Sequence, residues 1–245
     1  MYDPKGNGKD KAVTDVAFVE AKPPEHLRNI VHRFLELRCD GPLPDPYRFH
    51  ALPDACTYVV FDRNDPRVTG VTKLRIESEE FDLGTAFHFV NIRFLPGVWQ
   101  FDRQPTALGQ VKTPYEGAMP LLATSQALMG QDFDSVQTLL TGFVEQLVRD
   151  KLVMRNPVTE TIFRNIEDVH NVADMAELAD LSPRQLQRVL KATTGFSPHD
   201  FLKIIRLQLA ISGNDASYAD QSHFIHSFRR ATGYTPGKYT KKFDV

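Results

Sequence analysis

Side chains that can read DNA bases are concentrated between residues 183 and 194, in the last third of the chain. Arginine donates two hydrogen bonds to guanine O6 and N7, and glutamine pairs with the N6 and N7 atoms of adenine. Leu186, Val189 and Leu190 have the spacing of a buried helix face. Off that face lie Arg184, Gln185, Gln187, Arg188 and Lys191. The segment therefore predicts a helix whose exposed side chains contact bases or phosphates of double-stranded DNA.

The residues just before this segment predict a tight turn and a sharp helix start. Ser182 is a favoured N-cap residue, and Pro183 occupies the first helical position, where proline is well tolerated. Ala179-Asp180-Leu181 predicts the turn, because aspartate adopts the left-handed conformation more readily than most residues. Ala176 is a small residue where two crossing helices need close backbone approach. Together these features predict a helix-turn-helix whose second helix enters the major groove.

The end of this segment is repeated further along the chain. Ala192-Thr-Thr-Gly-Phe-Ser-Pro198 returns as Ala231-Thr-Gly-Tyr-Thr-Pro236, and internal repetition indicates a duplicated structural unit. A second recognition helix is therefore expected over residues 221–230. Its candidate DNA-contacting residues are Gln221, Ser222, His223, His226 and Arg229.

Residues 160–240 resemble the AraC/XylS family of bacterial transcription regulators. The matching motifs are Leu181-Ser182, Leu186-Gln-Arg188, Gly195-Phe-Ser-Pro198, Gln221-Ser-His-Phe224, Phe228-Arg-Arg230 and Gly233-Tyr-Thr-Pro236. The resemblance implies two helix-turn-helix units joined by a linker helix, here residues 198–210 with Ser197 as its cap. For Arg188 an alternative stays open, in which it braces the fold through Glu177 instead of contacting DNA.

The chain departs from the family pattern between the two units. Family members carry a scaffold helix before the second recognition helix, but only residues 211–217 separate Ala210 from Tyr218. Gly213-Asn-Asp215 favours a turn there. Three explanations stay open: a natural deletion, an engineered or domain-swapped form, or a stretch missing from the sequence as given, which the loop-like composition favours. A real deletion predicts that the second unit lacks packing for its helix and binds DNA poorly.

The chain as a whole predicts an α+β protein. We expect a disordered N-terminus over residues 1–12, a β-rich, barrel-like sensor domain over residues 13–154 and an all-α DNA-binding domain over residues 155–245. Residues 25–37 have helical spacing, although residues 31–38 also fit a strand. Strands are predicted over residues 13–19, 55–62, 70–77, 86–94 and 97–100, as in an open barrel or sandwich. Helices are predicted at residues 121–122 and over residues 133–154.

Two segments of the first half, Leu52-Pro-Asp-Ala-Cys-Thr-Tyr-Val-Val-Phe61 and Val90-Asn-Ile-Arg-Phe-Leu-Pro-Gly97, resemble a poorly characterised sensor-like domain. This domain precedes some AraC-type DNA-binding domains, and Ala55 stands where it usually has glycine. The resemblance names no ligand, but better-known relatives bind a small effector or form a homodimer through this half. The apolar stripe of residues 133–154 fits either a dimer contact or packing on the chain's own barrel.

Three residues of this half are candidates for effector contact: Arg93, His50 and Trp99. Arg93 could meet an anionic effector inside the barrel or pair with an acid such as Asp62. Trp99 fits a pocket wall or the core. His50, His88 and Cys56 are too scattered to predict a zinc site, and we expect no metal or other cofactor.

Composition excludes several classes of protein. A net charge of −2 is far less basic than that of a nonspecific nucleic-acid binder. Two cysteines imply no disulfide framework, and no apolar run predicts a membrane span or a signal peptide. The motifs of common hydrolases, nucleotide-binding enzymes and metalloproteases are lacking. We therefore predict a cytoplasmic, non-enzymatic transcription regulator controlled by an effector or by dimerisation. The alternative is a sensing or protein-binding module whose helix-turn-helix no longer binds DNA.

Overall fold

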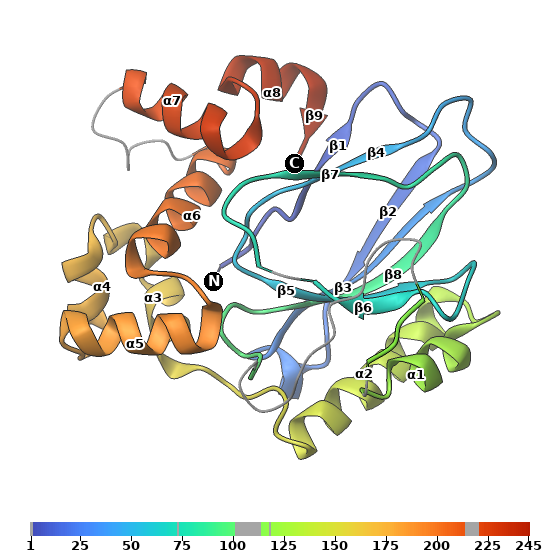
Figure 1. Cartoon of the computed structure of the whole chain (residues 1–245), viewed down its shortest axis with the longest axis horizontal. Coiled ribbons are helices and arrows are strands. Elements are labelled where there is room, and N and C mark those ends of the chain that lie inside the picture. Colours follow the sequence, from blue (N-terminus) through green and yellow to red (C-terminus); the bar gives the residue numbers. More distant parts are fainter. Residues whose placement is uncertain (1, 73, 101–113, 118, 214–220) are drawn as a thin grey trace.

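The computed structural model describes residues 2–72, 74–100, 114–117, 119–213 and 221–245. It confirms an α+β protein, in which two antiparallel sheets are flanked by two groups of helices (Figure 1). Among the described residues, no helix is long and apolar enough to cross a membrane.

The larger sheet has five strands in the order β2-β3-β8-β5-β6. Their bounds are Val16–Ala21 (β2), Val31–Cys39 (β3), Thr57–Asp62 (β5), Thr69–Val71 (β6) and His88–Phe94 (β8). Because successive side chains of a strand point to opposite faces, each strand supplies two layers. Phe34, Val59 and Ile92 are fully buried on one face, against helices α1 (Leu121–Leu128) and α2 (Phe133–Arg149).

The smaller sheet has four strands in the order β7-β4-β1-β9. Their bounds are Asn7–Asp10 (β1), Arg48–Ala51 (β4), Glu79–Asp82 (β7) and Phe243–Asp244 (β9). This sheet faces the larger one across an apolar cluster that includes Leu37, Phe89 and Phe49. The two sheets do not close on each other, so the expected barrel is an open, two-sheet arrangement.

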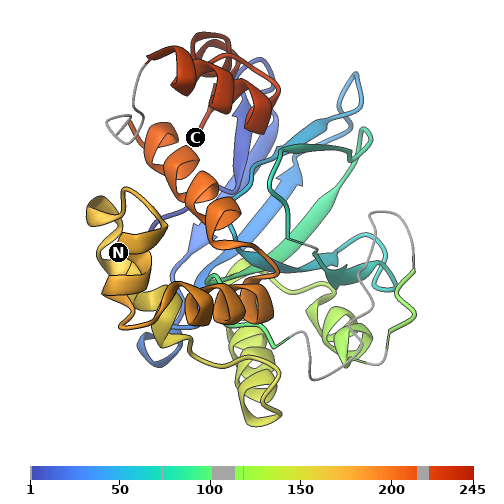
Figure 2. The same ribbon diagram turned by 60° about the vertical axis from the view of Figure 1, so that its left-hand side comes forward.

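The remaining helices follow in the second half of the chain. They are α3 (Pro157–Arg164), a 3-10 turn at Ile166–Asp168, α4 (Val172–Leu178), α5 (Pro183–Thr194), α6 (Pro198–Ile211), α7 (Gln221–Thr232) and α8 (Pro236–Lys242). Helix α6 runs between the α4–α5 pair and the α7–α8 pair (Figure 2). The linker helix expected from the resemblance is therefore present, and Ser197 caps it by accepting a hydrogen bond from the Asp200 amide.

Several local predictions were wrong. The N-terminal segment is ordered from residue 2, since Tyr2 is buried and stacks on Phe163 at 3.9 Å between ring centroids. The composition of this segment predicted disorder, but contacts with residues that are distant in the sequence hold it in place. Of the two alternatives for residues 25–38, the strand is confirmed and the long helix is wrong: residues 31–39 form β3, preceded by a short 3-10 helix at Glu25–Leu27. The strand expected at residues 97–100 is reduced to one bridge, between Trp99 and Val153.

The apolar stripe of α2 packs on the chain's own larger sheet. Val136, Leu140 and Leu147 are fully buried in the same cluster as the strand residues. Phe143 contacts Phe61 of β5 edge to face, at 5.9 Å between ring centroids. Of the two readings of this stripe, the structure therefore shows packing within the chain, and that face of α2 is not free for a dimer.

Candidate nucleic-acid interface and its scaffold

Helices α4 and α5 form the predicted helix-turn-helix. Asp180 has φ 51°, in the left-handed region that the sequence predicted for the turn. Ser182 caps α5: its Oγ accepts a hydrogen bond from the Gln185 amide (3.3 Å), and its own amide donates to Gln185 Oε1 (2.9 Å). Pro183 takes the first helical position, and Gly195 ends the helix with φ 72°. These reciprocal bonds fix the angle at which α5 leaves the turn.

The polar face of α5 is open to solvent. Leu186 and Leu190 are fully buried on the other face. The exposed side chains are Arg184, Gln185, Gln187, Arg188 and Lys191. Within the described part of the chain, no ion pair involves Arg184 or Arg188, so the bracing of Arg188 by Glu177 is not seen.

Two of the five candidates on α5 also have a structural role. The side-chain oxygen of Gln185 is engaged in the cap, so its NH₂ group is what remains for base recognition. Lys191 donates a hydrogen bond from Nζ to the Gly195 carbonyl at 2.9 Å, at the C-terminal end of the helix. Lysine is favoured there by the helix dipole. Arg184, Gln187 and Arg188 are therefore the side chains with the greatest freedom to contact DNA.

The second candidate helix, α7, has the same division of faces. Phe228 is buried, whereas Ser222, His226 and Arg229 are exposed. The side chains of Gln221 and His223 lie outside the described residues. In Figure 1, α5 and α7 lie at opposite ends of α6.

The scaffold of α7 is built by α6, α8 and β9 together with Leu52 from the N-terminal half of the chain. Phe228 is buried in a cluster with Leu52 from the first half, Leu207 of α6 and Tyr239 of α8, and Phe224 packs against this cluster. The expectation that Phe224 and Phe228 lose their packing partner is therefore wrong. A sequence pattern could not show this, because the partner lies more than 150 residues away.

Polar contacts fix the same unit to the smaller sheet. His50 of β4 donates a buried hydrogen bond from Nε2 to the Thr232 carbonyl (3.1 Å) and stacks on Phe243 at 4.8 Å between ring centroids. The Ser78 amide donates to the Ala231 carbonyl at 2.7 Å. The final strand β9 pairs with β1, so strands from the first and last parts of the chain lie side by side in one sheet (Figure 1).

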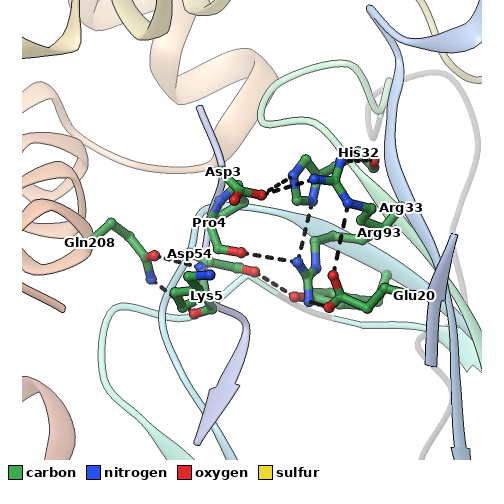
Figure 3. Close-up of polar contacts among 10 residues, drawn as sticks. Asp3, Pro4, Lys5, Glu20, His32, Arg33, Asp54, Arg93 and Gln208 are labelled. Atoms are coloured by element: carbon green, nitrogen blue, oxygen red, sulfur yellow. Dashed lines mark hydrogen bonds and ion pairs between the residues drawn. The ribbon is translucent and has the colours of Figure 1, made fainter. Parts of the chain in front are cut away.

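The N-terminal segment also binds the linker helix. Gln208 of α6 is buried, and its side chain makes three hydrogen bonds; Figure 3 draws those with Lys5. Oε1 accepts from the Lys5 amide (2.8 Å), while Nε2 donates to the carbonyls of Lys5 (3.1 Å) and Pro53 (2.8 Å). Residues 3–5 thereby join α6 to the sheet residues on their other side.

Arg93 lies on that other side and is 3% exposed. Its Nη1 donates to the Pro4 carbonyl (2.9 Å) and to His32 Nδ1 (3.2 Å), and Nη2 lies 3.4 Å from Glu20 Oε1 (Figure 3). The sequence left open a partner such as Asp62; the acid that Arg93 meets is Glu20. Burial, reinforced by the charges of Arg93 and Arg33, lowers the pKa of His32 to about 3.

The three effector candidates occupy different places. Arg93 lines a cavity between the two sheets. His50 lies in the contact between the smaller sheet and the α7–α8 unit. Trp99 is buried on the helix-covered side of the larger sheet and contacts Phe94 edge to face, at 5.4 Å. Asn91 was not among the candidates predicted from the sequence, although it alternates with Phe89 and Arg93 and therefore shares their face of β8.

Ala55 occupies a backbone position that explains the glycine usual there. Its φ is 58°, in the left-handed region that non-glycine residues adopt at a cost. Ala55 and Cys56 are buried in one cluster with residues of α3 to α6. This loop therefore joins the sheet domain to the first helix-turn-helix unit.

Fold and site together define a chain with a helix-turn-helix domain of AraC type at its C-terminal end, preceded by a sheet domain. Residues 175–242 match the family model described as a helix-turn-helix domain, and residues 19–106 match a domain of unknown function (DUF6597). The HTH-type transcriptional regulator MtrA of Neisseria gonorrhoeae is 32% identical over 91 residues, which cover 31% of this chain and 29% of that protein. The chain thus spans less than a third of this relative's length. No solved structure matches the chain.

The same comparison bears on the short connection between α6 and α7. A share of 31% of 245 residues is fewer than the 91 aligned positions, so this chain lacks residues that the Neisseria protein carries within the matched region. Its own sequence runs without interruption from Ile211 to Gln221. All three explanations of the short connection are consistent with this difference in length.

Proposed function

We propose that the protein is a sequence-specific DNA-binding transcription regulator of the AraC/XylS type. The observation that carries the proposal is the solvent-exposed face of α5, a helix with a complete N-terminal cap, on which Arg184 and Arg188 form no ion pair with any residue that the structure describes. Helix α5 enters the major groove, and these two arginines with Gln187 contact bases or phosphates. Gln185 contributes through its side-chain NH₂ group, because its oxygen is bonded in the cap. Lys191 contributes through the ammonium hydrogens that do not bond to the Gly195 carbonyl.

Helix α7 contacts an adjacent groove in this proposal. Ser222, His226 and Arg229 are its exposed candidates, and Gln221 and His223 are proposed from their sequence positions. Support comes from the buried Phe228, which orients the helix against the smaller sheet with its polar residues outward. The short connection between α6 and α7 is therefore compatible with DNA binding by the second unit.

Control by a small-molecule effector, by homodimerisation, or by both completes the proposal. The sheet domain supports effector control because its cavity is lined by Arg93, which also binds the segment that contacts α6. A homodimer would use a surface other than the apolar stripe of α2. Sedimentation velocity over a range of protein concentrations distinguishes monomer from dimer.

One observation favours a second candidate function. The α7–α8 unit is fixed to the N-terminal sheet, which restricts the adjustment of α7 relative to α5. A chain whose two helices cannot reach adjacent grooves would act as a sensing or protein-binding module. Such a chain would show weak DNA binding without sequence preference.

Selection from randomised duplex DNA, followed by fluorescence anisotropy at several salt concentrations, tests the proposal. We expect an enriched sequence and an affinity that falls steeply with salt. Arg184→Ala and Arg188→Ala should each weaken binding to that sequence by about 1–3 kcal/mol. Arg149→Ala, an exposed arginine at the end of α2, is the matched control and should leave the affinity unchanged. No enriched sequence, or equal affinities for all three variants, would refute the assignment of α5.

A further inference from the structure

A cavity of about 500 Å³ lies between the two sheets. From the larger sheet, the cross-strand neighbours Leu35 and Asn91 face it; from the smaller sheet, the neighbours Asn7 and Ala51 do. Binding sites for small molecules commonly enclose about 300–1,000 Å³. The cavity therefore has the size of a small-molecule site and is built by both sheets.

The walls of the cavity are mainly apolar. Aromatic and aliphatic side chains from strands β2 to β8 line it, among them Phe18, Leu37, Phe49, Val71 and Phe89. Water gains few hydrogen bonds in such surroundings, and an apolar ligand body is favoured there.

Four polar atoms on the wall are buried and make no hydrogen bond within the described part of the chain. Three are donors: Asn7 Nδ2, Arg93 Nε and Arg75 Nε, of which the last lies 3.6 Å from Glu79 Oε2 in an ion pair. The fourth is an acceptor, Asn91 Oδ1. Buried polar groups are almost always hydrogen-bonded in folded proteins. This concentration on one cavity points to a ligand with acceptor atoms and at least one donor.

The charged side chains of the wall are already paired within the chain. The pairs are Arg93 with Glu20 (3.4 Å), Arg75 with Glu79 (3.6 Å) and Glu36 with Arg38 (3.7 Å). A charged head group would have to displace one of these partners and leave its charge without compensation, which is unfavourable away from water. The wall therefore favours an uncharged head group.

We propose that this cavity binds an uncharged amphipathic small molecule. Its apolar body lies between the sheets, and its head group, a primary amide or a group of equivalent hydrogen-bonding pattern, accepts hydrogen bonds from Asn7 and Arg93 and donates one to Asn91. In one respect the inference rests on the proposed function, since this ligand would be the effector of a DNA-binding regulator.

The position of the cavity links it to the DNA-binding half. Asn7 belongs to β1, in which Lys9 and Asp10 pair with β9 at the end of the chain. The neighbouring Lys5 is hydrogen-bonded to Gln208 of α6. A ligand that contacts Asn7 therefore acts on the segment that holds both α6 and the α7–α8 unit.

A displacement experiment with matched probes tests the ligand class. Nile red, an uncharged dye that fluoresces in apolar sites, is bound to the full chain and displaced at pH 7 by octanamide, octanoate or octylamine. These three share one tail and differ in the head group. We expect octanamide to displace the dye at a concentration at least tenfold lower than either charged compound.

Two variants test whether Nile red and octanamide bind in this cavity. Val60→Phe fills the cavity beside Asn91 and Gly70, its cross-strand neighbours, and should abolish dye binding without lowering the melting temperature; Ile76→Phe, at an exposed position, is its control. Asn91→Leu removes the acceptor and should weaken octanamide about tenfold while Nile red still binds. Asn64→Leu, an exposed asparagine, should change neither.

Duplex binding measured on the same samples separates this inference from the proposed function. No dye binding, equal displacement by octanoate, or dye binding unchanged in Val60→Phe would overturn the cavity assignment, even if DNA binding is intact. Selective displacement by octanamide without any sequence-specific DNA binding would support the cavity assignment and overturn the regulator proposal.

Discussion

His50 of β4 and Thr232 at the C-terminal end of α7 are joined by a buried hydrogen bond of 3.1 Å, donated by Nε2 to the carbonyl oxygen. The two residues lie 182 positions apart in the sequence. Because Nε2 is the donor, the neutral ring carries its proton on that nitrogen. Burial lowers the pKa of His50 below its ordinary value, which is consistent with a neutral ring. Through this bond the sheet holds the end of the second candidate recognition helix.

Replacing His50 by alanine should loosen the α7–α8 unit. The variant loses one buried hydrogen bond and the stacking on Phe243, so the free energy of unfolding should fall by about 2–3 kcal/mol. Urea denaturation measures this loss. His199→Ala, at an exposed position, is the control and should change the free energy by no more than about 0.5 kcal/mol. Equal stabilities of the two variants would mean that the bond contributes little to holding α7.

The buried histidine beside Arg93 predicts a pH dependence of stability. His32 Nδ1 accepts a hydrogen bond from Arg93 and its Nε2 donates to Asp3, so the ring is neutral and its pKa is lowered to about 3 by burial and by the two nearby arginines. An unfolded histidine has a pKa near 6.5. Between these values the unfolded chain binds more protons, so the free energy of unfolding falls as the pH falls from about 6.5 toward 3.

The contribution of His32 to this slope is at most about 1.4 kcal/mol per pH unit. His32→Gln tests it, because the amide oxygen can accept from Arg93 and the amide nitrogen can donate to Asp3, but the side chain takes up no proton. Denaturation curves between pH 7 and pH 4 should show a shallower slope for this variant. His26→Gln, which removes an exposed histidine, is the comparison. The prediction fails if the His32→Gln slope equals that of the unaltered protein.

A side chain at Gly8 should displace the C-terminal strand. A Cβ atom there would lie 2.4 Å from Tyr239 Oη and 2.9 Å from Phe243 Cγ. Gly8→Val is therefore expected to cost about 1–3 kcal/mol through overpacking and to speed hydrogen exchange in α7 and α8 more than in α5. Gly41→Val is the matched control, since a Cβ at Gly41 meets nothing within 4 Å. Uniform acceleration in all three helices would argue against a separate C-terminal unit.

Local chemistry made the first helix-turn-helix predictable. The turn at Asp180, the cap at Ser182 and the stripe formed by Leu186 and Leu190 all depend on neighbours within a few residues, and the structure has each of them. The same is true of the linker helix and its Ser197 cap. Propensity and capping act over one turn, so they can be read from a short stretch of sequence.

Contacts between distant segments were not predictable in this way. Strand β9 has two residues and exists because β1 offers it a partner 233 positions away, at Asp10 and Phe243. The order of the N-terminal segment depends on Gln208 and Phe163, which no local pattern indicates. For the candidate site, residue types and spacing identified the exposed face of α5, whereas the cavity required knowledge of how the two sheets face each other.

Replacing Gln208 by leucine should release the N-terminal segment from α6. The substitution introduces an apolar side chain of similar size, but it removes the partner of the part-buried Lys5 amide and carbonyl and of the buried Pro53 carbonyl. A fully buried group without a partner costs about 1–3 kcal/mol, and the part-buried Lys5 groups cost less because water reaches them, so we expect the free energy of unfolding to fall by about 2–5 kcal/mol.

Trypsin cleavage after Lys5 reports the release directly. In the unaltered protein Lys5 is held by two hydrogen bonds, and cleavage there should be slow; in Gln208→Leu it should be at least tenfold faster under conditions where the rest of the chain stays folded. Gln126→Leu, at an exposed position of α1, controls for the change of residue type. If Lys5 is cleaved equally fast in both variants, the segment is held in place by Tyr2 and Arg93 alone, and Gln208 does not couple it to α6.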